Sequence, residues 1–451
     1  MNLIYNVKDR PAFGKTLIFA FQQVLAILAA TIAVPAIDGN GMSQSAALFG
    51  AGVGTIVYLL FTGFKSPVFL GSSFAFIGSM FAAFAGAVSS VELGYLGLII
   101  GACFAALVYV IIAIVSKFAG VKWISKLMPA VVIGPTVAII GLSLAGNAVG
   151  DMLKFAAYDA DNKVYVMGAK GWIGLVCALV TLLTVVICSV YGKKMLKLIP
   201  FIIGILAGYL VALIFTLIGN ATANETLKVI DFTAFSNMKW IPDFTFIKAF
   251  TAFKDLDGKY IATIAVAYVP VAFVVFAEHI ADHKNLSSII GKDLLEEPGL
   301  HRTLLGDGIG SFAGALFGGC PNTTYGESIG CVAITGNASV VTILTTAIIC
   351  LAASFVAPFV AFLSTIPPCV MGGVCVTLYG FIAVSGLKMI QGTDLNDNRN
   401  LFVVAVILIT GIGGMALKIG KVTITGVACA LILGIITNLI LSGKKQKTEK
   451  E

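Results

Sequence analysis

Long apolar runs recur along this chain, each about the length of a membrane-crossing helix, and short polar connections separate them. An α-helix needs about 20 residues to cross the hydrocarbon core of a bilayer, whereas a strand of a transmembrane barrel needs about 10 residues of alternating polarity. The runs have the length of helices, so the pattern predicts an all-α polytopic membrane protein. Ordinary spans are predicted near residues 15–36, 44–63, 94–116, 123–147, 171–191, 197–219, 259–281, 300–318, 338–362, 368–388, 401–417 and 421–442.

Two further apolar stretches, residues 67–80 and 318–335, are too short or too broken for an ordinary span. The first contains the sequence GSSFAF and the second contains YGE. With the twelve spans they make fourteen segments, and they fall third and tenth, at the same place in each seven-segment half. Broken segments at matching places are typical of transporters built as inverted repeats, with the substrate site where the two breaks meet. The predicted fold is therefore a 7+7 inverted repeat of fourteen transmembrane segments.

Composition and charge agree with a membrane protein. Only 11% of the residues are charged and 59% are hydrophobic, which leaves too little polar surface for a water-soluble globule. The formal charge is +7, but the lysines gather in short connections and the tail, which is the positive-inside pattern and not a nucleic-acid-binding patch. Fourteen segments place both termini on the lysine-rich side, so we expect cytoplasmic termini and the inner membrane of a bacterium. These lysines are Lys117, Lys122, Lys126, Lys193, Lys194, Lys197, Lys444, Lys445, Lys447 and Lys450.

The remaining sequence features give little support to an enzyme. The chain has no HExxH or phosphate-loop motif, and no catalytic residues are expected. Its nine cysteines form no CxxC pair, and neither a disulfide framework nor a metal site nor an organic cofactor is expected. Gly308, Gly310 and Gly314 lie within a predicted span and are interpreted as helix-packing residues. Of two longer connections placed outside, 148–170 and 220–258, the second is expected to form an ordered cap.

Two carboxylates bracket the central stretch of the chain, Glu278 at the polar end of an apolar run and Glu327 in the second broken segment. Burying a carboxylate within a membrane-spanning segment costs free energy unless the group has a partner, water or a proton, so such a residue indicates a functional site. Asp282 lies four residues after Glu278, on the same face of a helix, and two carboxylates this close repel when both are ionised. One of the pair therefore tends to keep a proton, as a proton-coupled carrier requires.

The neighbouring polar residues leave alternatives open. Asp282 could instead lie solvated at the cytoplasmic interface, because His283 and Lys284 follow it directly. His279 is interpreted as a residue that packs or hydrogen-bonds structurally, and His301 as an interfacial residue.

The second broken segment offers groups suited to a small planar ligand. Backbone N–H and C=O groups freed from helical pairing must be satisfied by protein, water or ligand. Gly326 lets a ligand approach the main chain closely, and Glu327 can accept hydrogen bonds from ring N–H groups. Phe74 and Phe76, in the first broken segment, either stack on such a ligand or simply pack. A planar amide-like molecule with alternating N–H and C=O groups matches this mixture.

Three strings of sequence carry a resemblance to a known family. They are AEH at 277–279, KDLL followed by PGLHR within 292–302, and PNTTYGE at 321–327, of which the last is quite specific. With them the chain resembles the nucleobase–ascorbate transporter family over nearly its whole length, and most of all the bacterial members that carry uracil. Further matching segments are residues 22–23, 71–76 and 368–380.

The resemblance implies a division into two domains. A core domain of segments 1–4 and 8–11 would comprise residues 1–116 and 259–362, and a gate domain of segments 5–7 and 12–14 would comprise residues 117–258 and 363–442, leaving 443–451 as a cytoplasmic tail. It also implies short strand-like pieces in segments 3 and 10, a homodimer, and symport of a nucleobase with a proton as the coupling ion.

The resemblance further implies roles for single residues. The two glutamates would accept hydrogen bonds from ring N–H groups, the backbone amides of Phe74 and Gly326 would meet the ring carbonyls, and two tyrosines would line the site or its gate. Carried over by position, the substrate-binding residues are Glu278, Glu327, Gly326, Phe74, Tyr325 and Tyr379, and the proton-coupling residues are Glu278 and Asp282.

Three positions depart from the family pattern. Asp282 stands where the characterised members that carry uracil have a histidine, Gln23 stands where many members have a histidine, and Ser328 replaces an asparagine. These changes could retune the choice of base.

We expect import of uracil, with a xanthine- or urate-type purine permease of the same fold as the alternative. An anion exchanger or channel of the same architecture is disfavoured, because such a site should not present Glu278 and Glu327 to its ligand.

Overall fold

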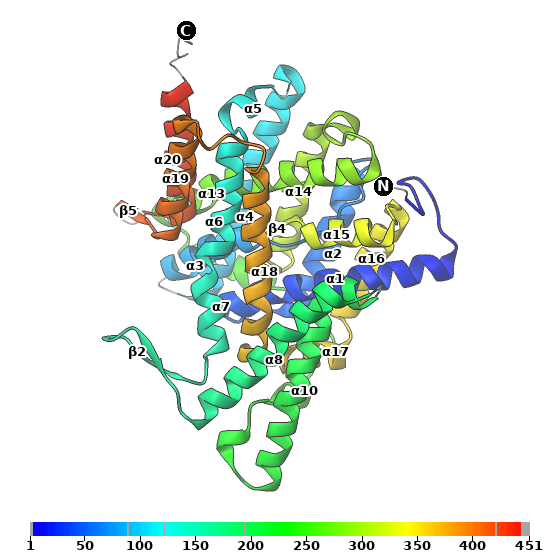
Figure 1. Cartoon of the computed structure of the whole chain (residues 1–451), viewed down its shortest axis with the longest axis vertical. Helices are drawn as coiled ribbons and strands as arrows, with labels where there is room; N and C mark the ends of the chain where they lie inside the picture. The colour runs from blue at the N-terminus through cyan, green and yellow to red at the C-terminus, as the bar shows by residue number, and fades with distance from the viewer. Residues whose placement is uncertain (1–2, 88–89, 121, 194, 420–421, 443–451) are drawn as a thin grey trace.

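The computed structural model describes residues 3–87, 90–120, 122–193, 195–419 and 422–442 (Figure 1). Within them, eight helices are long and apolar enough to cross a membrane, with α6 and α7 counted as one, and a ninth is obtained if a bent pair is one span. The helices are α1 (Phe13–Asp38), α2 (Gln44–Phe61), α4 (Val91–Ala119), α6 (Ala130–Ser143) with α7 (Ala145–Met152), α8 (Ala169–Tyr191), α10 (Pro200–Ala221), α13 (Gly258–Ile290) and α18 (Pro368–Met389).

Most predicted spans coincide with one of these helices, but the last third of the chain differs. The predicted span 338–362 is two helices, α16 (Val340–Ser354) and α17 (Ala357–Ser364), bent by 83° at the break. The predicted spans 401–417 and 421–442 contain the shorter helices α19 (Asn398–Ile412) and α20 (Gly426–Ser442). Helix length alone does not give fourteen segments, so that count and the inverted repeat stay predictions.

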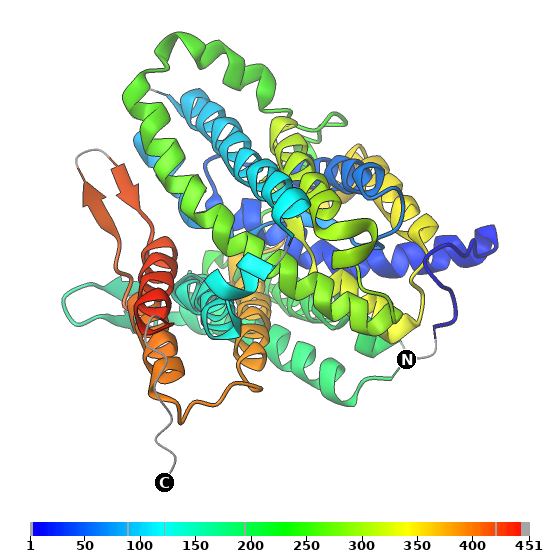
Figure 2. The same cartoon turned by 90° about the horizontal axis from the view of Figure 1, so that it is seen from above.

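A β-hairpin that the sequence analysis did not anticipate joins α19 to α20. Its strands are β5 (Leu417–Ile419) and β6 (Val422–Ile424), paired antiparallel, and it projects beyond these two helices (Figure 2). The alternation of valine, threonine and isoleucine in residues 422–425 has the β-branched composition of a strand. The predicted span that began at residue 421 was therefore placed about five residues too early.

The two broken segments contain the short strands that the family resemblance implied, and these strands pair in a small sheet. Strand β1 (Leu70–Ser72) pairs antiparallel with β4 (Asn322–Thr324), with Gly71 opposite Thr323, and all six strand residues are buried. The 3-10 turn η1 (Phe74–Phe76) and α3 (Ile77–Gly86) follow β1, and α15 (Gly326–Thr335) follows β4. Pairing between the strands satisfies backbone groups that no helix satisfies at this depth. The helical segments that follow the two strands, η1 with α3 and α15, therefore begin close together inside the protein.

Glycines allow close helix packing around this sheet. Helix α14 (Leu300–Leu316) packs against both α2 and α4. A Cβ atom on Gly310 would lie 2.6 Å from the carbonyl oxygen of Gly54, and one on Gly50 would lie 2.6 Å from that of Gly314. Gly308 faces α4 in the same way. The interpretation of these α14 glycines as helix-packing residues is confirmed.

The other half of the molecule is built around α18. This helix packs along α6 and against α7 and α8, and α8 packs against α10 (Figure 1). Two short helices, α5 (Lys122–Leu127) and α9 (Met195–Leu198), precede α6 and α10. The side of α18 turned away from α6 and α8 contributes to the cavity described below.

The two longer connections are ordered. Residues 148–170 contain the hairpin β2 (Ala157–Asp159) with β3 (Val164–Val166). Residues 220–258 contain η2 (Glu225–Leu227), α11 (Thr233–Ser236), α12 (Phe246–Ala249) and η3 (Phe250–Asp255). Phe244 and Phe49 pack with ring centroids 4.9 Å apart and so fasten this connection to α2. The remaining irregular turn, η4 (Leu295–Gly299), joins α13 to α14.

Candidate functional site

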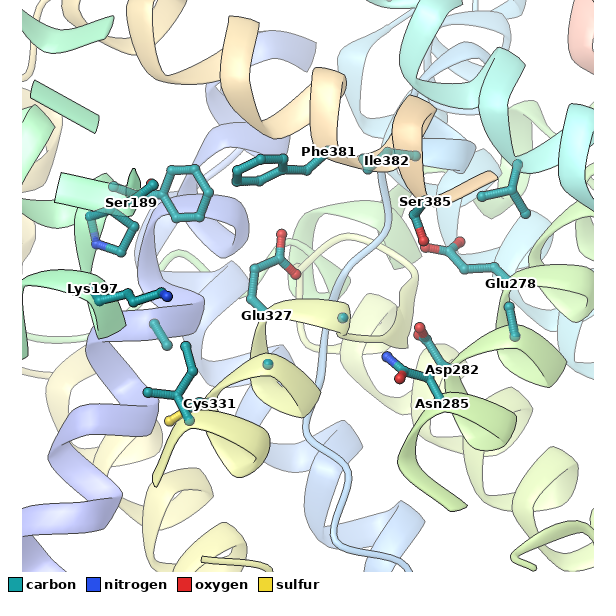
Figure 3. Close-up of a pocket in the computed structure, with 18 residues that line it drawn as sticks. Ser189, Lys197, Glu278, Asp282, Asn285, Glu327, Cys331, Phe381, Ile382 and Ser385 are labelled. Carbon is teal, nitrogen blue, oxygen red and sulfur yellow. The ribbon is translucent and has the colours of Figure 1, made fainter. Parts of the chain in front are cut away.

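A cavity of about 370 Å³ lies where α13, α15, α10 and α18 come together (Figure 3). Its volume falls within the range of small-molecule sites, about 300–1,000 Å³. Most of its wall is apolar, with a few polar side chains that converge from different helices. The polar and charged lining residues are Ser189, Lys197, Glu278, Asp282, Asn285, Glu327 and Ser385.

Helix α13 supplies one wall of the cavity. Asp257 caps its start by accepting a hydrogen bond from the Tyr260 backbone N–H, 2.6 Å away. Glu278, Asp282 and Asn285 follow at helical spacing and all line the cavity. The structure therefore brings the two carboxylates predicted to share a face into one cavity.

Asp282 is half-buried in this wall and tied to the small sheet. Its Oδ2 atom accepts a hydrogen bond from Thr324 Oγ1 of β4, across 2.6 Å. Lys284, two residues later, is exposed, whereas Asp282 lines the cavity. The carboxylate faces the cavity beside the start of α15.

Helix α15 supplies both a hydrogen-bond acceptor, the Glu327 carboxylate, and the backbone N–H donors of its first turn. Gly326 and Glu327 line the cavity in its first turn, and Gly330 and Cys331 continue the same face. The first N–H groups of a helix have no intrahelical partner, and here no side chain caps them. A Cβ atom on Gly326 would meet Asp282 Oδ1 at 3.8 Å and no other atom within 4 Å, so main-chain donors are accessible beside the carboxylates.

Three predicted site residues lie behind the cavity, and none of them is among its lining residues. Tyr325 is buried and donates a hydrogen bond from its hydroxyl to the Ser72 carbonyl oxygen, across 2.9 Å. The rings of Phe74 and Tyr379 meet edge to face with centroids 5.5 Å apart. Tyr325 therefore connects the start of α15 to β1, and the ring of Phe74 packs against Tyr379 of α18.

The aromatic groups that do line the cavity were missed from the sequence. Phe201 of α10 and Phe381 of α18 form an edge-to-face pair with centroids 5.8 Å apart. No local signal distinguished them from other aromatic residues in apolar runs, since the contact depends on how α10 and α18 pack. They give a bound ring an apolar wall facing the carboxylates.

The histidines of α13 point away from the cavity. His279 Nδ1 lies 2.7 Å from Asp307 Oδ2, and His279 Nε2 lies 3.0 Å from Thr303 Oγ1, which agrees with the interpretation of His279 as a hydrogen-bonding structural residue. His283 Nε2 contacts the hydroxyl of Tyr58 at 2.6 Å. Asp307 was not singled out, although the rule that found Glu278 and Glu327, an acid within an apolar run, applied to it equally.

Two positions that depart from the family pattern contact each other. Gln23 of α1 donates a hydrogen bond from Nε2 to the backbone carbonyl oxygen of Ser328, across 3.3 Å. Both side chains are buried and neither lines the cavity. This hydrogen bond connects α1 to the first turn of α15. His301, the predicted interfacial residue, is half-buried in the first turn of α14.

The chain matches a model of a permease family over residues 14–420. It is 40% identical to the uracil permease of Bacillus caldolyticus, covering 99% of this chain and 96% of that protein. It is 33% identical to the uracil permease of Escherichia coli K12, covering 96% and 93%.

Solved structures with the same fold have little sequence in common with this chain. The transmembrane domain of the cyanobacterial bicarbonate transporter BicA has a TM-score of 0.65 at 15% identity, with 96% of this chain and 100% of that domain covered. Murine solute carrier 26 family member A9, described as an anion transporter, has a TM-score of 0.67 at 12% identity, with 96% and 69% covered.

Proposed function

This chain belongs to the nucleobase–ascorbate transporter family, and we propose that it imports a nucleobase, with uracil as the preferred substrate. Its full-length match to permeases and its many long apolar helices make it a multi-pass membrane transporter and not an enzyme. The relatives named uracil permease support the substrate class, and the chemistry of the cavity supports it independently.

The observation that carries the proposal is that Glu278 and Glu327 face one cavity from two different helices. Ionised carboxylates only accept hydrogen bonds, so they suit the ring N–H groups of a base. The open amides at the start of α15 suit its carbonyl oxygens. Phe201 and Phe381 offer the ring an aromatic wall, on which edge-to-face or offset packing is favourable.

We assign the coupling proton to Glu278 and Asp282. They stand one helical turn apart in the cavity wall, and two carboxylates at that spacing are most stable when they share a proton. In the proposed cycle, protonation of this pair accompanies substrate binding. The core domain then moves against the gate domain and exposes the site to the other side of the membrane.

The finer architecture is part of the same proposal. The core domain comprises residues 1–116 and 259–362, and the gate domain comprises residues 117–258 and 363–442. Fourteen segments in an inverted repeat place both termini in the cytoplasm, and we propose the inner membrane as the location and a homodimer as the assembly. The pairing of β1 with β4 supports the repeat, because each strand precedes a helix at the matching place in its half.

The test is uptake of radiolabelled uracil by proteoliposomes, with and without an inward proton gradient. We expect gradient-driven accumulation in the wild type and its loss in Glu327→Ala, since removing a charged hydrogen-bond partner costs about 1.5–3 kcal/mol. Glu297→Ala is the matched control. Glu297 lies in the connection between α13 and α14, where hydrogen bonds from Lys292 and Lys65 lower its pKa to about 2.

Three other outcomes would redirect the proposal. Xanthine or urate flux without uracil flux would assign the protein to the purine carriers of this fold. Chloride or sulfate currents would support the anion class to which the solved structures of similar fold belong. Accumulation of uracil that ignores the proton gradient would keep the substrate and remove the coupling.

A further inference from the structure

The charged groups around the cavity are three carboxylates and, among the lining residues, a single cation. The carboxylates belong to Glu278, Asp282 and Glu327, and the cation is Lys197. From the sequence, Lys197 was grouped with surface lysines of a cytoplasmic connection. In the structure this exposed lysine is one of the residues that line the cavity.

The segment that carries Lys197 is held close to α15. Ile199, two residues later, packs against Ala26 of α1 and Cys331 of α15. Cys331 lies one helical turn after Glu327, on the face that lines the cavity. Lys197 extends toward Glu327 from the side of the cavity opposite Asp282 (Figure 3). Within the described part of the chain, the lysines that form ion pairs are Lys65, Lys228, Lys248 and Lys292, and Lys197 is not one of them.

The hydrogen-bonding needs of a nucleobase explain such a residue. A ring with alternating N–H and C=O groups needs acceptors and donors in turn. The three carboxyl groups supply acceptors, apart from the one O–H donor that the proton shared by Glu278 and Asp282 would provide. The amides of α15 supply donors on one side. Lys197 adds a charged donor on the facing side, with three N–H groups on a long flexible side chain.

We propose that Lys197 donates a hydrogen bond to a ring carbonyl oxygen of the bound base, and that it selects for bases with a carbonyl at the edge facing α10. This inference rests on the proposed function. In this proposal Lys197 determines specificity, and it lies on the side of the cavity opposite Glu278. A base that lacks an oxygen at that edge would leave the ammonium group without its partner.

The test is a binding series on purified protein with uracil, 2-thiouracil and 4-thiouracil, since sulfur is a weak hydrogen-bond acceptor. The wild type should prefer uracil to the analogue whose sulfur faces Lys197. In Lys197→Met, uracil binding should weaken by about tenfold or more, the usual effect of losing a charged hydrogen bond. Binding of that analogue should change little, so the preference between the two ligands should disappear.

Lys193→Met is the matched control, because Lys193 is exposed four residues earlier and does not line the cavity. Melting temperatures of both variants check that they fold. An equal loss for all three ligands would contradict the inference, because Lys197 would then act by neutralising Glu327. Unchanged uracil binding and preference would contradict it as well. Failure of the wild type to bind uracil would instead contradict the proposed function and the inference together.

Discussion

His279 Nδ1 and Asp307 Oδ2 lie 2.7 Å apart, and both side chains are sealed from solvent. The hydroxyl of Thr303 donates to the Leu300 carbonyl oxygen, so its oxygen accepts a hydrogen bond from His279 Nε2. Nε2 therefore carries a hydrogen, and one further proton is shared between Nδ1 and the carboxyl group. The pair is neutral as a unit, which explains how an acid remains inside an apolar bundle.

This arrangement predicts that Asp307→Asn will be tolerated better than Asp307→Ala. The amide of asparagine can donate to Nδ1, whereas alanine leaves that atom buried without a partner, at a cost of about 1–3 kcal/mol. Thermal unfolding of the purified variants in detergent measures the difference. Equal losses of melting temperature would mean that the pair stabilises the fold through its charges and not through the hydrogen bond.

A second prediction separates proton coupling from substrate binding at Asp282. Asp282→Asn can keep the hydrogen bond from Thr324, since the amide oxygen accepts it, but it cannot carry a proton. We expect uracil binding within about threefold of the wild type, a change well below 1 kcal/mol. Concentrative uptake should be lost.

Thr324→Val is the partner experiment, because it removes the hydrogen bond and keeps the carboxylate. Its uptake should retain the pH dependence of the wild type. Uptake by Asp282→Asn that still follows the proton gradient would show that the proton is carried elsewhere in the cavity.

Sequence reasoning reached the parts of this site that depend on local spacing. Glu278 and Asp282 share a helix face because they are four residues apart, whatever the helix packs against. The breaks at β1 and β4 were visible as short apolar stretches interrupted by polar residues and glycine. The strand-like pieces came from the family resemblance, since a three-residue strand leaves too few positions to show a period. Their antiparallel pairing was not predicted and is seen in the structure.

The parts that were missed depend on tertiary contacts. Lys197 looked like one of several interfacial lysines, because nothing in its neighbours shows that Ile199 packs against α15. Phe201 and Phe381 become a wall only when α10 meets α18. The bend between α16 and α17 lies in a mostly apolar run where hydropathy gives no boundary, although Pro358 in the first turn of α17 was a local signal for it.

A third prediction concerns the N-terminal segment, which fastens the far end of α15. Ile4 N–H donates to the Gly336 carbonyl oxygen across 2.7 Å, and Ala338 N–H donates to that of Tyr5 across 2.9 Å. Helix α15 has ten residues, and helices that short are unstable alone. The β1–β4 sheet fixes the end that carries Glu327, and the N-terminal segment fixes the other.

Ile4→Pro removes the shorter of the two backbone hydrogen bonds to the Gly336 carbonyl oxygen, the other coming from Tyr5 N–H across 3.2 Å, and should lower both the melting temperature and the affinity for uracil. One hydrogen bond contributes about 0.5–1.5 kcal/mol, so the loss of affinity should not exceed about tenfold. Ile4→Ala is the matched control, because the Ile4 side chain is 65% exposed and alanine keeps the N–H group. If the two variants bind uracil equally well, the segment does not position the site.

The last prediction tests the close contact between α2 and α14. A Cβ atom on Gly310 would lie 2.6 Å from the Gly54 carbonyl oxygen, and a backbone atom cannot move aside as a side chain end can. Gly310→Ala should therefore push the helices apart and destabilise the protein by about 1–3 kcal/mol, the usual cost of overpacking. Gly146→Ala in α7 meets no atom within 4 Å and should stabilise slightly, since alanine favours a helix. Because β4 packs on α14, separating α2 from α14 should also displace β4 and the start of α15. Uracil binding should therefore weaken in Gly310→Ala and not in Gly146→Ala. Equal melting temperatures for the two variants would contradict the packing argument.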